Sequence, residues 1–506
     1  MPRQRVIVIT LGVMLSLFMA SMESTVVATA MPTIVSQLGG LSTYSWVFSV
    51  YMLTSTTTVP LYGKLSDIYG RRPIYAIAMT LFLIGSALCG MSQSMGQLIA
   101  ARAVQGLGAG GVLPLAFIII GDLFTFEQRA RIQGVFSGVW GVSSVIGPLL
   151  GGFLVDQVSW HWVFYVNIIP GLLALALVWR AWHDRPRPTS TARPKIDYLG
   201  AVLLTASVIA LLIGLGSLGT SVGWVALAAA ALLFIVLAYV EQRAADPVLP
   251  LTLFRQRLFA VACLHGLLAG WGMFGSASYV PLYVQAVLGT SATVAGAAIM
   301  PMMLAWVLAS IVGSRLLLRV GYRTLSVIGM VLFTIGALAL TQSGGAFGAP
   351  LLLGSMALMG VGMGLSIPSF LIAVQSTVPR ETLGTATSTL QFSRSIGGTL
   401  GVSVMGALLS ARLASGLLAA GLDPSSVSLN DLIDPIAQTA DAPAFDGILR
   451  TVLASAIQGV FWLAFGAAVL ALIATILAPA GQISQLAKQR SQAETEHVPP
   501  PLPIGD

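Results

Sequence analysis

The chain has 506 residues, of which 56% are hydrophobic and only 8% are charged. Soluble domains carry about 25% charged residues, and no soluble core could bury this much apolar surface, so the composition excludes an ordinary soluble protein. The formal net charge of +7 does not indicate a nucleic-acid partner, because the basic residues follow the pattern of membrane loops described below.

Apolar runs of about 20 residues are long enough to cross a bilayer as helices, and the sequence has fourteen of them. It therefore predicts an all-α polytopic membrane protein. In chain order, the expected helices are 6–31, 43–63, 73–93, 97–120, 131–155, 162–182, 197–217, 222–242, 257–288, 292–314, 324–342, 348–377, 383–411 and 450–478. The connections are short except at 183–196, 243–256 and 412–449, and the polar, Pro-rich tail 479–506 is expected to be disordered.

Most of the 25 Lys and Arg residues lie in loops on the side of the membrane that holds the N-terminus. Only Arg412 and Arg450 are expected on the other side, and Arg102 and Arg394 lie within helices. Because Lys and Arg favour the cytoplasmic side, we expect both termini in the cytoplasm and the basic loops facing anionic lipid headgroups. The acidic loop 412–449 is then extracytoplasmic.

Two segments of the chain are similar to each other. GLGAGGVLP (106–114) and GVGMGLSIP (360–368) share three glycines and a proline in register. This repeat predicts an N-terminal six-helix bundle (1–182) and a C-terminal six-helix bundle (257–478), with two extra helices in the linker between them (183–256). Parallel repeats of this kind place a substrate site between the halves, near the middle of the membrane.

Motifs for other chemistries are missing from the sequence. There is no G-x-x-x-x-G-K-[ST], H-E-x-x-H or C-x-x-C, so we expect neither ATP-driven transport nor an enzyme, and no cofactor or metal. The G-x-G-x-x-G pattern in GLGAGG lies inside a membrane helix, where small residues serve close packing. Cys89 and Cys263 lie in apolar runs and are expected to be buried thiols.

Several ordered motifs are similar to those of one transporter family. GKLSDIYGRRP (63–73) matches the loop between helices 2 and 3 of the major facilitator superfamily, and IAARAVQGLGAGG (99–111) resembles its helix-4 motif. GVWGVSSVIGPLLGG (138–152) resembles its antiporter motif. ESTVVATAMP (23–32) and WHWVFYVNIIPG (160–171) are typical of the fourteen-helix drug:proton antiporters, the EmrB/QacA branch. The chain departs from this branch at Glu23 and Ala28, where Asp and Asn are usual. Some members of the branch carry acidic residues in helices 10 and 13, whereas here expected helix 10 has none and expected helix 13 has Arg394 instead.

The resemblance implies two conformational devices. In the first motif, Asp67 would dock on the positive N-terminal end of the helix that starts near residue 382, in one conformation only; the alternative is an ordinary solvated turn. The residues of this latch are Gly63, Asp67, Gly70, Arg71 and Arg72. In the antiporter motif, small residues and a proline would form a tight, kinked contact that prevents leak; the alternative is plain helix packing. Its residues are Gly141, Gly147, Pro148, Gly151 and Gly152.

Glu23 is the carboxylate that lies deepest inside an expected helix. A charge at the bilayer centre costs roughly 3 kcal/mol on insertion scales, and such residues usually face a cavity and have a function. Desolvation favours the protonated form of a carboxyl group near neutral pH, so Glu23 is the expected proton carrier. Arg102 is its expected counter-charge. The alternatives are a neutral Glu23 bonded to Ser or Thr, and an Arg102 bonded to backbone carbonyls.

Aromatic and Met residues on the central helices suggest a wall for bulky lipophilic guests. The candidates for this substrate cavity are Tyr51, Trp140, His265, Trp271, Phe274, Met303, Trp306 and Arg394. The leading hypothesis is a monomeric proton-coupled antiporter that exports lipophilic, often cationic, drugs or dyes by alternating access. The alternatives are a dedicated exporter of an endogenous lipid or metabolite, and a sensor or structural membrane protein.

Overall fold

The computed structural model describes residues 2–38, 44–183, 197–218, 220–244, 247–249, 251–290, 292–343, 348–421 and 443–481. These residues form helices and connections, with no strand among them. Most of the expected tail, residues 482–506, lies outside the described residues, as do 184–196 of the expected linker and 422–442 of the expected acidic loop.

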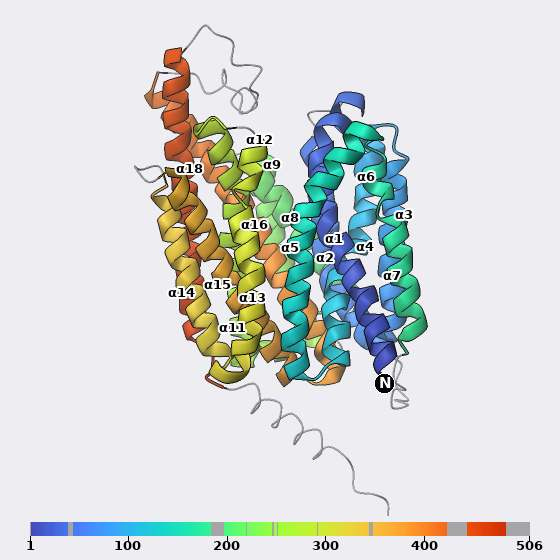
Figure 1. The fold of residues 1–506 in the computed structure, drawn as a ribbon. Coiled ribbons are helices and arrows are strands. Elements are labelled where there is room, and N and C mark those ends of the chain that lie inside the picture. The colour runs from blue at the N-terminus through green and yellow to red at the C-terminus, as the bar shows by residue number, and fades with distance from the viewer. Residues whose placement is uncertain are drawn as a thin grey trace, which may run out of the picture.

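Two groups of helices stand side by side (Figure 1). The first group holds the helices α1 (Arg3–Leu38), α2 (Tyr44–Tyr69), α3 (Arg71–Gly90), α4 (Met95–Leu123), α5 (Phe126–Gln157), α6 (Trp162–Tyr165) and α7 (Ile168–Ala181). The second group holds α11 (Arg257–Leu282), the π-helix η2 (Tyr283–Val287), α12 (Ala292–Ala297), α13 (Met300–Val320), α14 (Tyr322–Thr341), α15 (Gly348–Thr377), the 3₁₀-helix η3 (Arg380–Thr382), α16 (Leu383–Ala419) and α18 (Pro443–Ile476). Between them in the chain come α8 (Tyr198–Gly216), α9 (Ser221–Arg243) and the short α10 (Leu251–Phe254).

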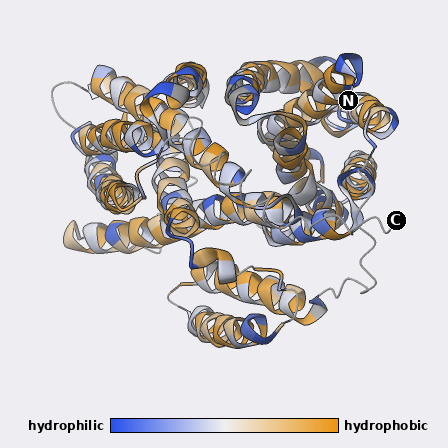
Figure 2. Ribbon diagram, turned by 90° about the horizontal axis from the view of Figure 1, so that it is seen from below, coloured by the Kyte–Doolittle hydropathy of each residue, from blue (hydrophilic) through white to orange (hydrophobic). Residues whose placement is uncertain are grey.

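Eleven helical stretches among the described residues are long and apolar enough to cross a membrane. Large hydrophobic side chains are exposed along them, and Figure 2 shows hydrophobic residues along the helices of the molecule. The chain is therefore a multi-pass membrane protein. Helices α2, α5 and α8 are not among the eleven, so the count of fourteen spans stays a prediction.

Helices extend into both ends of segment 412–449, which the sequence predicts to be a loop. Helix α16 runs to Ala419, and α18 begins at Pro443. The expected helix ends at residue 411, but Leu413 and Leu417 are buried and continue the packed face of α16. The guanidinium of Arg412 fits over Gly459 of α18, so its charge does not stop the helix.

The single helix expected at 162–182 is broken. Helix α6 ends at Tyr165 and α7 begins at Ile168. Pro170 has no N–H to donate to the carbonyl one turn earlier, which weakens the helix at this point. Asn167 sits at the break, fully buried, and its side chain enters the polar cluster described below.

The glycines of the internal repeat make equivalent contacts in the two groups. In α4, a side chain at Gly106 or Gly110 would collide with α2, and one at Gly108 would collide with α3. In α15, Gly360 and Gly364 lie in the same way against α13, and Gly362 against α14. Each group therefore contains one central helix that packs closely on two neighbours through the same glycine pattern.

Helices α8 and α9 lie outside both groups. They stand behind the groups in Figure 1, and the view along the helices shows a pair of helices apart from the rest (Figure 2). Their apolar residues share one buried cluster with residues of α2 and α16, among them Leu204, Val208, Val59 and Phe392. The pair therefore packs on one helix from each group and bridges the line where the groups meet.

Hydrogen bonds join the two groups towards the face where the N-terminus lies, at the bottom of Figure 1. We call this the N-terminal face, and the contact between the groups there the seam. Across the seam, the Ser137 hydroxyl of α5 donates to the Ser310 hydroxyl of α13 over 2.7 Å. Arg129, near the start of α5, donates to the Gln375 carbonyl near the end of α15 over 3.2 Å.

Candidate functional site

A buried ion pair lies inside the first group of helices. Arg102 Nη1 on α4 is 2.7 Å from Glu23 Oε1 on α1. The side chain of Arg102 is only 1% exposed and that of Glu23 is not exposed at all. Charges removed from water in this way are stable only when paired and fully hydrogen bonded. The structure thus brings together the two residues that the sequence predicted to interact, while their role in proton coupling stays a prediction.

Neutral polar side chains complete the hydrogen bonding of this pair. Gln105, one turn after Arg102 on α4, donates to Glu23 Oε1 over 2.9 Å and accepts from Arg102 over 2.7 Å. Asn167 donates to Glu23 Oε2 over 2.5 Å from the break between α6 and α7. The Ser86 hydroxyl of α3 accepts from both amides and donates to the Phe164 carbonyl. Both oxygens of the carboxylate therefore have donors.

The amide oxygen of Asn167 is buried and has no hydrogen-bond partner among the described residues. It belongs to the same amide group whose nitrogen donates to Glu23. If that amide turned by 180°, its oxygen would face Glu23 and could accept the O–H of a protonated carboxyl group. The site thus has a donor ready for the ionised form of Glu23 and an acceptor ready for the protonated form.

Helix α2 covers the ion pair from the side. Arg102 Nε donates to the Val47 carbonyl over 3.2 Å, and the guanidinium carbon lies 4.0 Å from the centre of the Tyr51 ring. This cation–π contact is strong where water is absent. Tyr51, a predicted cavity residue, therefore touches Arg102 directly.

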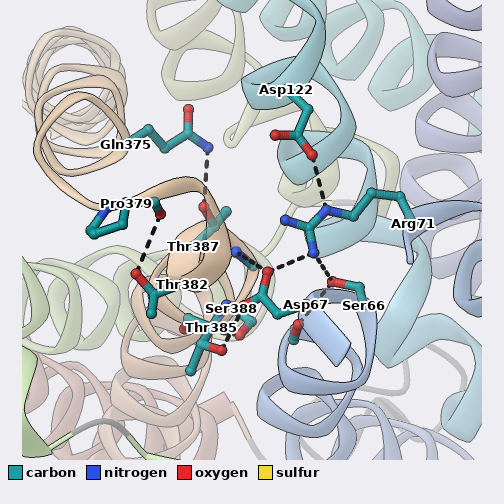
Figure 3. A network of polar contacts seen from close by, with 12 residues as sticks. Ser66, Asp67, Arg71, Asp122, Gln375, Pro379, Thr382, Thr385, Thr387 and Ser388 are labelled. Carbon is teal, nitrogen blue, oxygen red and sulfur yellow. Dashed lines mark hydrogen bonds and ion pairs between the residues drawn. The ribbon is translucent and has the colours of Figure 1, made fainter. Parts of the chain in front are cut away.

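The latch motif lies on the seam (Figure 3). The Asp67 carboxylate near the end of α2 accepts from Gly384 N over 3.0 Å and from Thr385 N over 2.7 Å, at the N-terminal end of α16. The Thr385 hydroxyl adds a third bond of 2.7 Å. Free backbone N–H groups and the helix dipole make a helix N-terminus favourable for a carboxylate. The geometry is the one the latch requires, and its role in the transport cycle stays a proposal.

Glycines allow this crossing of α2 and α16. A Cβ at Gly63 would lie 1.9 Å from the Ser388 hydroxyl and 2.7 Å from the Gly384 carbonyl, and one at Gly384 would lie 2.6 Å from Asp67. Gly70 has a different role: it precedes α3 with φ of 102°, which only glycine adopts without strain.

The two arginines of the motif bind within the first group. Arg71 donates to Asp67 over 2.5 Å and to Asp122 of α4 over 3.0 Å, so it holds Asp67 in place for α16. The guanidinium carbon of Arg72 lies 4.1 Å from the centre of the Trp179 ring of α7.

The residues of the antiporter motif do not act at one place. A Cβ at Gly141 would lie 2.8 Å from Val307 of α13, so this glycine belongs to the contact between the groups. A Cβ at Gly147 would meet Thr25 of α1 at 2.0 Å, which is packing inside the first group, and one at Gly152 would meet nothing within 4 Å. Gly151 is buried, and the side chain of Pro148 lies outside the described residues.

The remaining cavity candidates are dispersed. His265 is 1% exposed and its Nδ1 is 3.0 Å from the Thr475 hydroxyl, so it faces the interior of the second group rather than an open wall. The rings of Trp271 and Phe274 lie over Gly401 and Gly398 of α16. Arg394 is half-buried on α16, and the structure shows no hydrogen bond or ion pair to it from the described residues. Of the three further candidates, Met303 and Trp306 are partly buried and Trp140 is exposed.

Some residues of the site were missed by the sequence analysis. Gln105 and Asn167 carry no charge, so a search for charged residues in membrane helices passes over them, although Asn167 lies in the quoted motif 160–171. On the seam, Gln375 donates to the Phe117 carbonyl of α4 and to Thr387 of α16, and so connects three helices. An i, i+3 search from Arg102 would have found Gln105.

The fold and the buried ion pair together define a class of protein, a helical membrane transporter made of two packed groups. A family model described as Major Facilitator Superfamily matches residues 13–402. The chain therefore belongs to the major facilitator superfamily and is a transporter rather than an enzyme.

Known relatives and structures agree with this assignment. The chain is 38% identical to the multidrug transporter protein MdtP of Bacillus subtilis over 464 residues, which cover 90% of this chain and 84% of that protein. It is 39% identical to multidrug resistance protein 3 of the same organism, over 79% of this chain and 78% of that protein. Among solved structures, the human organic anion transporter MFSD10 (TM-score 0.60, 16% identity) matches 92% of this chain and 100% of its own. The proton:xylose symporter XylE (TM-score 0.60, 14% identity) matches 94% and 95%. At these identities the two structures show the fold alone.

Proposed function

We propose that this protein is a proton-coupled antiporter of the fourteen-helix drug:proton branch, which exports lipophilic, often cationic, compounds from the cytoplasm by alternating access. The observation that carries the proposal is the buried Glu23–Arg102 pair, a proton-binding group with its counter-charge inside one half of a major facilitator fold. The names of the two Bacillus subtilis relatives support drugs as substrates. We place the protein in the cytoplasmic membrane of a bacterium with both termini inside.

Glu23 is the proposed proton carrier. In this conformation its carboxylate accepts hydrogen bonds from Arg102, Gln105 and Asn167, an arrangement that suits the ionised form. A proton that reaches Glu23 from the outside neutralises the carboxylate and weakens its hold on Arg102, and the helices can then shift towards the inward-open state. The amide oxygen of Asn167 then accepts the new O–H.

The seam assigns a state of the cycle to this conformation. The groups are joined at the N-terminal face by the Asp67 contacts and by the bonds of Ser137 and Arg129. With that face in the cytoplasm, the substrate path is closed on the inside, which is the state in which an exporter releases its substrate. In this state we expect Glu23 to take up a proton from the outside, and to release it to the cytoplasm after the protein has returned to the inward-open state.

Arg394 favours a second candidate function. A half-buried guanidinium in a membrane helix with no carboxylate bonded to it among the described residues is suited to an acidic group of a substrate. This supports the dedicated export of an acidic lipid or metabolite. Competition between a cationic dye and an acidic amphiphile for efflux from vesicles separates the two candidates.

The test of proton coupling uses Glu23→Gln in proteoliposomes with an imposed pH gradient. We expect the variant to keep its fold and to lose gradient-driven dye efflux. The matched control is Glu241→Gln, because Glu241 of α9 is also a buried carboxylate (3% exposed) but is bonded to the backbone of Leu249. Gradient-driven efflux at the wild-type rate in Glu23→Gln would refute the proton-carrier role.

A further inference from the structure

A groove of about 1290 Å³ lies along the face on which α5 meets α13. This is the face towards the viewer in Figure 1, and α8 and α9 lie behind. Its walls come from α1 and α5 of the first group and from α13 of the second, and they are mostly apolar, with Phe18, Val139 and Ile311 among them. The groove is therefore open to the lipid side of the molecule and crosses from one group to the other.

Three arginines lie at one end of this groove. Arg131 is in the second turn of α5, while Arg315 and Arg319 are in the last turns of α13. Helix α5 starts and α13 ends at the N-terminal face, so the three charges meet there. All three side chains are exposed, and the structure shows no hydrogen bond or ion pair from them to any side chain or backbone group that it describes. The side chain of Glu127, one turn before Arg131, lies outside the described residues. No acidic residue is among the residues that line the groove.

The dimensions of the groove match one leaflet of a bilayer. From Arg131 to Val142, α5 rises about 16 Å at 1.5 Å per residue, and Val142 is the lining residue of α5 farthest from the N-terminal face. The hydrocarbon core of a bilayer is about 30 Å thick. A molecule with its head at the arginines would thus have its apolar part along half of the membrane.

We propose that this groove binds an anionic phospholipid, whose phosphate lies at Arg131, Arg315 and Arg319 and whose acyl chains follow the apolar wall. Guanidinium groups bind phosphate through paired, charge-assisted hydrogen bonds, and basic pockets between membrane helices on the cytoplasmic side are suited to acidic headgroups. The volume is above the roughly 300–1,000 Å³ of drug-sized pockets, which leaves room for two chains. A soluble anion would use the arginines but not the apolar wall.

This lipid would favour the conformation described above. Its headgroup contacts Arg131 from the first group and Arg315 and Arg319 from the second, so both groups must be close together for full binding. A ligand shifts a conformational equilibrium by the difference between its affinities for the two states. Anionic lipid in the inner leaflet therefore stabilises the closed seam. This inference does not depend on which compound is exported.

The experiment is native mass spectrometry of the purified full-length protein with dioleoyl phosphatidylglycerol or dioleoyl phosphatidylcholine, which have the same chains. We expect the wild type to prefer the anionic lipid. In Arg131→Gln/Arg315→Gln/Arg319→Gln, its affinity should fall on the order of 100-fold, at roughly fivefold per arginine near an anionic surface. The matched control, Arg3→Gln/Arg180→Gln/Arg255→Gln, removes the same charge from exposed arginines outside the groove and should bind as the wild type does.

A second variant tests the acyl part of the site. Gly138 lines the groove, and a Cβ there would meet no atom within 4 Å, so Gly138→Leu fills the groove without a clash. Gly138→Leu should lower the affinity for phosphatidylglycerol at least tenfold. Gly466→Leu, in similarly open space on α18, should leave that affinity unchanged. Equal loss in both arginine variants, or phosphatidylglycerol bound normally by Gly138→Leu, overturns the proposal. If millimolar inorganic phosphate displaced bound phosphatidylglycerol as strongly as added lipid does, the arginines would be a site for a soluble anion instead.

Discussion

Asp67→Asn tests the seam with almost no change of shape. The Asp67 side chain is 5% exposed, so water screens its interactions very little. Its carboxylate accepts from the two backbone N–H groups of Gly384 and Thr385 and from the Thr385 hydroxyl. An asparagine side chain has one oxygen and one NH₂ group, so one of those donors loses its acceptor and faces another donor.

The cost follows from these contacts. A buried donor without an acceptor costs about 1–3 kcal/mol, and the loss of a negative charge at a helix N-terminus costs about 0.3–2 kcal/mol. Together these give about 1.3–5 kcal/mol against the closed seam, which changes the conformational equilibrium roughly 8- to 4,000-fold. Because the first group keeps its own packing, we expect normal amounts of folded protein and slower turnover.

Spin-label distances measure this shift directly. Labels at the exposed positions Arg180 and Arg255 report the separation of the groups near the N-terminal face, in a background where Cys89 and Cys263 are replaced by Ala. Asp122→Asn is the control, because Asp122 binds the same arginine, Arg71, without reaching α16. The reasoning fails if Asp67→Asn gives the wild-type distance distribution, or if the Asp122 variant moves it as far.

Two further outcomes follow from the structure. Arg102→Ala should move the pH profile of efflux to higher pH, because loss of the cation 2.7 Å from Glu23 favours the protonated carboxyl group. The profile of Arg102→Lys should lie between those of the wild type and Arg102→Ala. A profile that stays in place would show that the pair is only structural. Gly63→Ala should open the seam in the same spin-label measurement, because its Cβ would lie 1.9 Å from the Ser388 hydroxyl and 2.7 Å from a backbone carbonyl, whereas Gly466→Ala, in open space, should not.

The helices and the charged contacts could be predicted from the sequence, because a membrane allows only long apolar runs to cross it and makes an unpaired charge inside them unfavourable. Apolar runs locate the helices, and a carboxylate and an arginine inside them need partners, which singled out Glu23 and Arg102. Asp67 was singled out by a motif whose partner is a helix end rather than a side chain. Only the structure shows that Arg71 donates a hydrogen bond to the same Asp67 carboxylate and so orients it towards α16.

Other features could not be read from the chain. Gln105 and Asn167 are neutral, and their importance comes from distances that only the packed helices set. The break that places Asn167 depends on a proline three residues later, which many helices tolerate. The glycines of 138–152 share one motif, yet Gly141 faces the other group and Gly147 faces α1, because one helix presents different faces to different neighbours.

Helix α2 connects the seam to the ion pair. It carries Tyr51 and the Val47 carbonyl on Arg102, and Asp67 on the N-terminal end of α16, within one continuous helix. Tyr51 and Asp67 are separated by about 24 Å of helix at 1.5 Å per residue. We propose that α2 also moves against α4 when the seam opens, which changes its contacts with Arg102 and the hold of Arg102 on Glu23. We propose that proton binding at Glu23 and the rocking of the two groups are coupled through α2, because the position of this helix affects both.

A double-mutant cycle tests this connection. We expect the shifts in the pH midpoint of efflux caused by Tyr51→Ala and Asp67→Asn to be non-additive, because each variant releases the same helix from one of its ends. Gln105→Ala with Asp67→Asn is the control pair: Gln105 touches Glu23 from α4 without a bond to α2, so its shift should add to that of Asp67→Asn. If the Tyr51 and Asp67 variants add as the control pair does, α2 does not transmit the opening of the seam, and Glu23 must sense it through α1 and α5, which meet at Thr25 and Gly147.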